Sequence, residues 1–199
     1  MKISRISLIV LTLSVATVKP YCANSQNLDI DILKSINPQH PNSHLWAETS
    51  NSVYLVPLSI AGSQMIYGIL DKDKQARQKS IELLLSVEAG MLLSQGMKLA
   101  VNRTRPQYEW PGKVFSLSSS NTKSFPSGHA TIAFATATTL ALQYKKWYVT
   151  VPAFAWATGV SYSRMYLGKH YPSDVLAGAA IGVGSAFLCH WLSKKIFKK

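Results

Sequence analysis

The feature that most restricts the fold of this chain is a series of five apolar segments separated by clusters of basic residues. Clusters follow the first, third and fifth segments, so all of them fall on one side if the segments alternate across a bilayer. With Lys2 and Arg5 they hold 12 of the 21 lysines and arginines. Positive charge kept on the cytoplasmic side is typical of membrane proteins, whereas a soluble helical protein has no reason to phase its charges this way. The apolar segments are 53–70, 81–99, 130–144, 147–166 and 175–196.

Length and composition agree with a single membrane bundle. The chain has 199 residues, 47% of them hydrophobic and only 15% charged, so its net charge of +12 does not come from a disordered basic tail. Its two cysteines have neither the number of a disulfide scaffold nor the spacing of a zinc site. We predict an all-α, polytopic membrane bundle of five or six spanning helices, with no nucleic-acid partner and no obligate protein partner.

The N-terminus allows two interpretations. Basic Lys2 and Arg5 precede an apolar run over 6–18, which has the length of a signal-peptide core and is short for a spanning helix. Residues 1–23 are therefore either a secretory signal or a first membrane helix. We expect 24–50 to be a periplasmic segment lying along the membrane surface, and 51–199 to form the membrane domain.

Small and acidic residues inside the segments give packing expectations. Gly178 and Gly182 stand four apart, a spacing that lets helix backbones approach closely in lipid. Glu88 falls near the middle of its segment, where an ionisable group is costly, so we expect it to have a buried partner outside the site. Glu82 falls at the cytoplasmic end and is expected to be solvated.

Three groups of residues on the outer side, opposite the basic clusters, carry the chemistry. Lys98, Arg105 and Arg164 supply positive charge, and two of them are planar forks suited to phosphate oxygens. Because all three groups fall at outer ends of segments, they can converge in one site. Singly, each also fits an interfacial lysine, a helix cap or a loop histidine. The groups are Lys98 with Arg105-Pro106, then Pro126-Ser127-Gly128-His129, then Ser163-Arg164 with His170 and Asp174.

The second and third groups combine anion binding with proton transfer. Ser127 and Gly128 precede a helix, where backbone N–H groups favour an anion. His170 can attack phosphorus, Asp174 can hold its other ring nitrogen, and His129 can protonate the leaving oxygen. Pro172 is expected to begin the last helix, which places His170 in the loop before it.

These residues resemble the three signature motifs of the type 2 phosphatidic acid phosphatase superfamily: Lys-x6-Arg-Pro, Pro-Ser-Gly-His and Ser-Arg-x5-His-x3-Asp. The resemblance extends from about residue 81 to the C-terminus. It implies a six-helix membrane core, a phosphohistidine formed on His170, orientation by Asp174, general acid catalysis by His129, and no metal or cofactor. It also implies phosphate binding by Lys98, Arg105, Ser127, Gly128 and Arg164. Vanadium haloperoxidases share this pattern, but their chains are much longer.

The expected function is removal of phosphate from an amphiphilic lipid at the periplasmic face of a bacterial inner membrane. Resemblance to short bacterial members of the family favours lipid A as the substrate, with undecaprenyl pyrophosphate and phosphatidylglycerophosphate as alternatives. Two rivals are a surface protein that binds anionic lipids without turnover, and a metal site built from Glu109 with His40 or His44. The loop over 107–125 also offers head-group contacts through Glu109, Trp110, Lys113 and Lys123.

Overall fold

The computed structural model describes residues 22–119 and 121–197, and this part of the chain is helical, with one isolated β-bridge and no strand. The signal peptide or first helix predicted over 1–23 lies outside the described residues except for its last two positions, which begin the first helix. The helices are α1 (Cys22–Ile36), α2 (His44–Leu70), α3 (Lys74–Val101), α4 (Pro106–Glu109), α5 (Gly128–Tyr144), α6 (Trp147–Tyr166) and α7 (Pro172–Phe197).

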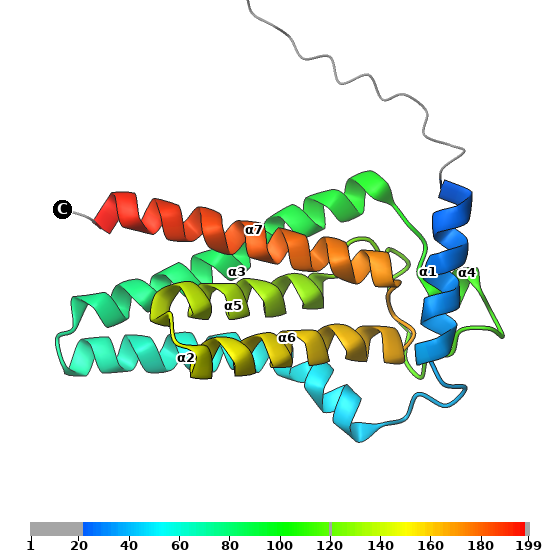
Figure 1. The fold of residues 1–199 in the computed structure, drawn as a ribbon, viewed down its shortest axis with the longest axis horizontal. Helices are drawn as coiled ribbons and strands as arrows, with labels where there is room; N and C mark the ends of the chain where they lie inside the picture. The colour runs from blue at the N-terminus through cyan, green and yellow to red at the C-terminus, as the bar shows by residue number, and fades with distance from the viewer. Residues whose placement is uncertain (1–21, 120, 198–199) are drawn as a thin grey trace, which may run out of the picture.

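Five long helices run along the same axis, and α1 lies across one end of them (Figure 1). The α3–α5 and α6–α7 connections are at this end, which we call the outer end. The α2–α3 and α5–α6 turns are at the opposite, inner end. The described basic clusters therefore share the inner end, as the alternation of segments predicts. They comprise Lys72, Lys74, Arg77, Lys79, Lys145, Lys146, Lys194 and Lys195.

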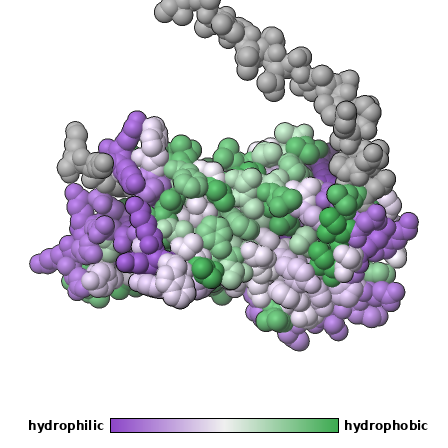
Figure 2. Space-filling view, viewed as in Figure 1, coloured by the Kyte–Doolittle hydropathy of each residue, from purple (hydrophilic) through white to green (hydrophobic). Residues whose placement is uncertain are grey.

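The surface of the bundle is divided along its length. On the face shown in Figure 2, apolar residues form a band around the middle and hydrophilic residues gather at both ends. In the described chain, His44–Leu70 and Pro172–Ile196 are long and apolar enough to cross a membrane by length and composition. The apolar segments at 81–99, 130–144 and 147–166 also form helices, but they do not meet that test.

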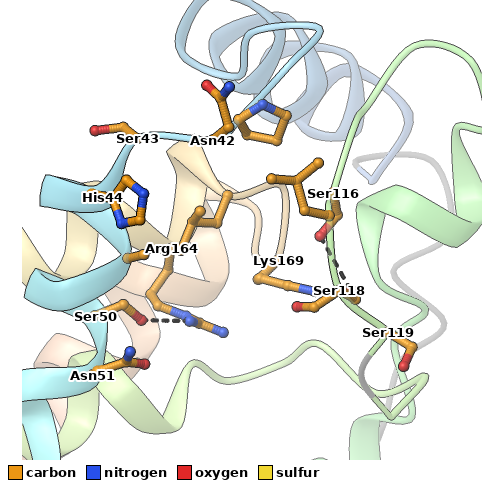
Figure 3. Close-up of a pocket in the computed structure, with 14 residues that line it drawn as sticks. Asn42, Ser43, His44, Ser50, Asn51, Ser116, Ser118, Ser119, Arg164 and Lys169 are labelled. Carbon is orange, nitrogen blue, oxygen red and sulfur yellow. Dashed lines mark hydrogen bonds between the residues drawn. The ribbon is translucent and has the colours of Figure 1, made fainter.

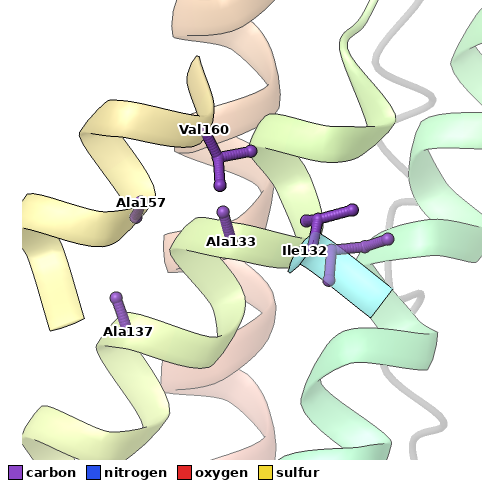
Figure 4. Packing of buried hydrophobic residues seen from close by; sticks show 6 residues of the cluster. Ile132, Ala133, Ala137, Ala157 and Val160 are labelled. Atoms are coloured by element: carbon purple, nitrogen blue, oxygen red, sulfur yellow. The ribbon is translucent and has the colours of Figure 1, made fainter. Parts of the chain in front are cut away.

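Helix α5 occupies the centre of the bundle. Its Ala133 and Ala137 pack against Ala157 and Val160 of α6 (Figure 4). These side chains are small, so the two helices approach closely and α5 is buried along most of its length. This central position brings the N-terminus of α5, which carries the second motif, between the ends of its neighbours.

Two glycines set the contact between α7 and α5. A Cβ on Gly178 would collide with the backbone carbonyl oxygen of Ser127, and one on Gly182 with that of Thr131. Neither oxygen can move without shifting α5, so the prediction of close backbone approach at this pair is confirmed. The contact holds Ser127 against the first turns of α7.

Residues 24–50, expected to be a periplasmic segment, form most of α1 and the start of α2, and α1 packs on the outer loops through Ile30 and Leu33. Two local expectations were wrong. Glu82 is buried and lies 2.9 Å from Nδ1 of His190 on α7, because its side of α3 faces α7. Glu88 is exposed, since it lies on another side of the same helix.

Candidate active site

The three motifs meet at the outer end because each lies where a long helix begins or ends. Lys98 is in the last turn of α3, and Asn102, in the left-handed conformation, is the C-cap residue of this helix. Arg105 caps α4, with Pro106 in its first turn. Ser127 caps α5 and accepts a hydrogen bond from the backbone N–H of Ala130. Arg164 is in the last turn of α6, His170 is in the following loop, and Asp174 is in the first turn of α7.

Arg105 connects the first motif to the third. Its Nη1 donates to the carbonyl oxygen of Lys169 at 2.8 Å and lies 3.2 Å from Nε2 of His170. Its Nε donates to the carbonyl oxygen of Asn121 at 2.6 Å, so the loop before α5 fixes the orientation of the guanidinium. Burial lowers the pKa of Arg105, but a guanidinium remains charged at physiological pH.

His170 is almost completely buried, with 1% of its surface exposed. Burial, and then the charges of Arg164, Arg105 and Lys98, lower its pKa well below the ordinary value. The imidazole is therefore neutral at physiological pH, and with a proton on Nδ1 its Nε2 keeps a lone pair directed toward Arg105. This is the form that a nucleophilic histidine requires.

Asp174 lies beside His170 as the spacing of the third motif indicates. Its Oδ2 is 3.5 Å from Nδ1 of His170, longer than a usual hydrogen bond, and accepts a 2.9 Å bond from the backbone N–H of Tyr171. The backbone N–H of Ser127 donates to the Asp174 carbonyl oxygen at 2.9 Å. This bond ties the second motif to the third.

Arg164 has an unused donor in a buried position. Its Nη1 donates to Oγ of Ser50 on α2 at 2.6 Å, whereas its buried Nε has no hydrogen-bond partner among the described residues. A buried guanidinium N–H without an acceptor is unfavourable, and an anion is the natural group to accept it.

The remaining motif residues close the site. A Cβ on Gly128 would lie 4.0 Å from Nζ of Lys98, so glycine leaves space beside that ammonium group. Lys98 lies near enough to Arg105 and Arg164 for their charges to repel one another. His129 interacts with the same three cations and with His170, and its ring meets Tyr54 edge-on at 5.4 Å. We call Lys98, Arg105 and Arg164 the cationic cluster.

A cavity of about 560 Å³ opens beside the cationic cluster, between the start of α2 and the loop after α4. Arg164 and Lys169 line it together with hydroxyl and amide groups that include Ser50, Asn51 and Ser118 (Figure 3). Lys169 is buried, and its Nζ donates to Oε1 of Gln107 and to the carbonyl oxygen of Ser118. Burial, and then Arg164 and Arg105, lower the pKa of Lys169 to about 8.

Sequence reasoning missed several residues around the site. Arg103 forms an ion pair with Asp174 at 2.9 Å and with Asp29 of α1 at 2.8 Å. Its position within the first motif was a possible signal, whereas nothing in the sequence marks Asp29, Ser50 or Asn121, which reach the site from distant segments.

In the loop over 107–125, two of the residues expected to contact a lipid head group contact other parts of the protein. Glu109 accepts a hydrogen bond from the Tyr171 hydroxyl at 2.7 Å, and Trp110 packs against a cluster that includes Tyr171 and Leu33. Both residues therefore join this loop to the segment before α7, and Trp110 also joins it to α1. Among the described residues, no group of three His, Cys, Asp or Glu side chains is arranged to hold a metal ion. The alternative metal site with His40 or His44 thus lacks a clustered ligand set.

The comparisons with known proteins agree with this geometry. Residues 79–198 match the PAP2 superfamily. The chain belongs to this superfamily. The PAP2 chain is 33% identical over 155 residues to a lipid A 1-phosphatase of Porphyromonas gingivalis, covering 74% of this chain and 31% of the relative. It is 35% identical over 116 residues to an undecaprenyl-diphosphatase of Sulfolobus acidocaldarius, covering 58% of this chain and 55% of the relative. The chain thus spans about a third to just over half of these relatives.

Two solved structures share the fold of this PAP2 chain. LpxE of Aquifex aeolicus is 27% identical, with a TM-score of 0.63, and the match covers 84% of this chain and 95% of that one. A transmembrane PAP2 type phosphatidylglycerolphosphate phosphatase of Bacillus subtilis is 25% identical, with a TM-score of 0.69. The match covers 87% of this chain and 88% of that one. The helical bundle is therefore that of the PAP2 phosphatases.

Proposed function

We propose that this chain is an integral membrane phosphatase that hydrolyses a lipid phosphate monoester or pyrophosphate through a phosphohistidine on His170. The observation that carries the proposal is the contact between Arg105 and Nε2 of His170, at 3.2 Å, which places a neutral, buried imidazole nitrogen against the cationic cluster. A phosphate bound by that cluster lies next to the nitrogen that attacks it.

The reaction has two balanced steps. First, the lone pair of His170 Nε2 attacks phosphorus, the bond from phosphorus to the lipid oxygen breaks, and His129 gives that oxygen a proton. The negative phosphate favours the protonated form of His129 before the step. Second, a water molecule gives a proton to His129 while the water oxygen attacks phosphorus. The bond from phosphorus to Nε2 of His170 breaks, and free His170 and phosphate are released. Asp174 stabilises the positive charge on the His170 ring in the intermediate.

Phosphate charge is neutralised by protein cations in this proposal, without a metal or cofactor. Lys98, Arg105 and Arg164 supply three positive charges, and the free Nε of Arg164 adds a donor. The backbone at Ser127 and Gly128 adds the N-terminal end of α5, where N–H groups and the helix dipole favour an anion. Anion stabilisation of this kind also favours the five-coordinate transition state.

We place the protein in a bacterial inner membrane, spanned by the five long helices, with the outer end in the periplasm. The separation of basic clusters from the site supports this orientation. In this arrangement 51–199 form the phosphatase domain, and 24–50 lie on the periplasmic side. Residues 1–23 are a signal peptide or a further membrane helix.

Lipid A is the substrate that we favour, with undecaprenyl pyrophosphate and phosphatidylglycerophosphate as alternatives. The likeness to lipid A 1-phosphatases supports this choice. The cavity beside Arg164 agrees with it, because hydroxyl and amide groups suit the hydroxyls of a sugar head group.

The test is phosphate release by purified protein in detergent from each of the three lipids, after exhaustive chelation and with or without vanadate. We expect release that resists the chelator, is inhibited by vanadate and is fastest with lipid A. Vanadate adopts the geometry of the transition state, so a site built for that state binds it. Binding of the lipids without any phosphate release would support the non-enzymatic alternative, and activity that returned only with added metal would refute the histidine mechanism.

A further inference from the structure

The carboxylate of Asp174 is divided between two sets of partners. Its Oδ1 accepts a 2.9 Å bond from Nη1 of Arg103, and its Oδ2 accepts from the backbone N–H of Tyr171 and faces Nδ1 of His170. Asp174 is completely buried, so its position depends on contacts within the protein, which also include a hydrogen bond with Ser124. The placement of Arg103 therefore affects how Asp174 meets His170.

Arg103 is itself shared between two carboxylates. Its Nη2 donates to Oδ2 of Asp29 at 2.8 Å, and its guanidinium lies 3.8 Å above the ring of Tyr171. Burial acts to lower the pKa of Arg103, but Asp174 and Asp29 outweigh it, so the pKa is raised and the cation is stabilised. One nitrogen of the fork serves each carboxylate, and Nη1 also donates to Oγ of Ser173 at 2.6 Å, which fixes the guanidinium between α1 and α7.

Asp29 is held by the first turn of α7. Its Oδ1 accepts a 2.9 Å bond from the backbone N–H of Ser173, and its Oδ2 accepts from the Ser173 hydroxyl. The neighbouring Ile30 and Leu33 pack in a buried cluster with Tyr171, so α1 cannot slide along the site. Asp29 lies outside residues 79–198, which match the superfamily.

We propose that Asp29 is a positioning residue for the phosphatase reaction, acting through Arg103 on Asp174. The inference rests on the proposed phosphohistidine chemistry. Two carboxylates compete for one guanidinium fork, and Asp29 restricts Arg103 to a single bond with Asp174. Without that competition, Arg103 turns toward Asp174 and binds both of its oxygens, which is the preferred geometry of an arginine–carboxylate pair. Oδ2 is then drawn away from His170, and the charge that forms on the ring is less well stabilised.

Asp29→Asn tests this role with little change in shape, and Asp31→Asn is the matched control. Asp31 lies on the same helix but is exposed, and its ion pair within the described part of the chain is with Lys34, at 3.6 Å. We expect Asp29→Asn to lower kcat about tenfold and to leave KM within about twofold, because the cationic cluster is unchanged. The measurement uses the full chain in detergent and the lipid, among the three, from which phosphate is released fastest. Asp31→Asn should match the wild type.

An Arg103→Gln background separates positioning from simple stabilisation of α1. If Asp29 acts through Arg103, adding Asp29→Asn to Arg103→Gln lowers kcat no further. A second loss of similar size in that background, or a normal kcat for Asp29→Asn alone, would overturn the inference. This comparison also decides the matter if Asp29→Asn lowers the unfolding temperature, since a structural loss reduces kcat in both backgrounds.

The His170→Ala variant distinguishes failure of the Asp29 inference from failure of the proposed function. If the His170→Ala variant is as active as the wild type, the phosphohistidine mechanism is overturned and, with it, the role of Asp29. An inactive His170→Ala together with a fully active Asp29→Asn overturns the role of Asp29 alone.

Discussion

Nη1 of Arg105 lies 3.2 Å from Nε2 of His170, although the two residues are 65 positions apart in the sequence. In the proposed mechanism, a phosphate bound by Arg105 lies next to this nitrogen, which attacks it. Arg105 is held from the other side by Asn121, so the cation stays in position when phosphate enters. We therefore propose that the site is preorganised for an anion.

Replacing His170 with alanine should lower kcat by at least about a thousandfold, because it removes the proposed nucleophile. His129→Ala should cost about 10²–10⁴-fold through loss of proton transfer. Phosphate release and thermal unfolding in detergent measure the two effects, with Asp31→Asn as the folded control. Near-normal release by His170→Ala would rule out the mechanism.

Arg164→Lys should lower kcat/KM about a hundredfold, although it keeps the charge. The arginine donates to Ser50 through Nη1 and keeps Nε free for phosphate, and an ammonium group cannot satisfy both directions. Ser50→Ala, which removes only the supporting hydroxyl, should cost no more than about threefold. Steady-state kinetics of the two variants check this order, and equal losses would contradict it.

KM should rise as pH increases through about 8, the pKa of Lys169, because this lysine then loses the charge that attracts phosphate into the cavity. Lys169→Arg keeps its charge over this range, so its KM should rise less between about pH 7 and pH 9. Lys113→Arg, at an exposed position, is the matched control and should follow the wild type. The same rise in all three proteins would exclude Lys169 from substrate binding.

The orientation in the membrane can be checked by cysteine labelling in a Cys22→Ser background. Ser119→Cys at the outer end should react with an impermeant reagent added to the periplasmic side, and Gln75→Cys at the inner end should not. Both positions are exposed, so a difference between them reports their side of the membrane. The prediction follows from the one-sided basic clusters. Reversed labelling would place the site in the cytoplasm.

The sequence located the ends of α3, α5, α6 and α7 that carry the three motifs, whereas α2, which brings Ser50 to the site, begins at His44 and not at 53. Segment ends, the start of α7 at Pro172 and the close approach at Gly178 depend on local composition and on spacing, which are visible along the chain. The three motifs also predicted which residues meet, because the same phasing that separates the basic clusters places all three motifs at the outer end.

The tertiary structure alone decided which way individual side chains face. Glu82 and Glu88 lie on one helix whose apolar residues form no clear stripe, so hydropathy predicted their depth but not that Glu82 faces α7 while Glu88 is exposed. Asp29 and Arg103 are separated by 74 positions, and their ion pair exists because α1 packs across the end of the bundle. A spacing rule describes neighbours within an element, whereas contacts between distant elements depend on how those elements pack.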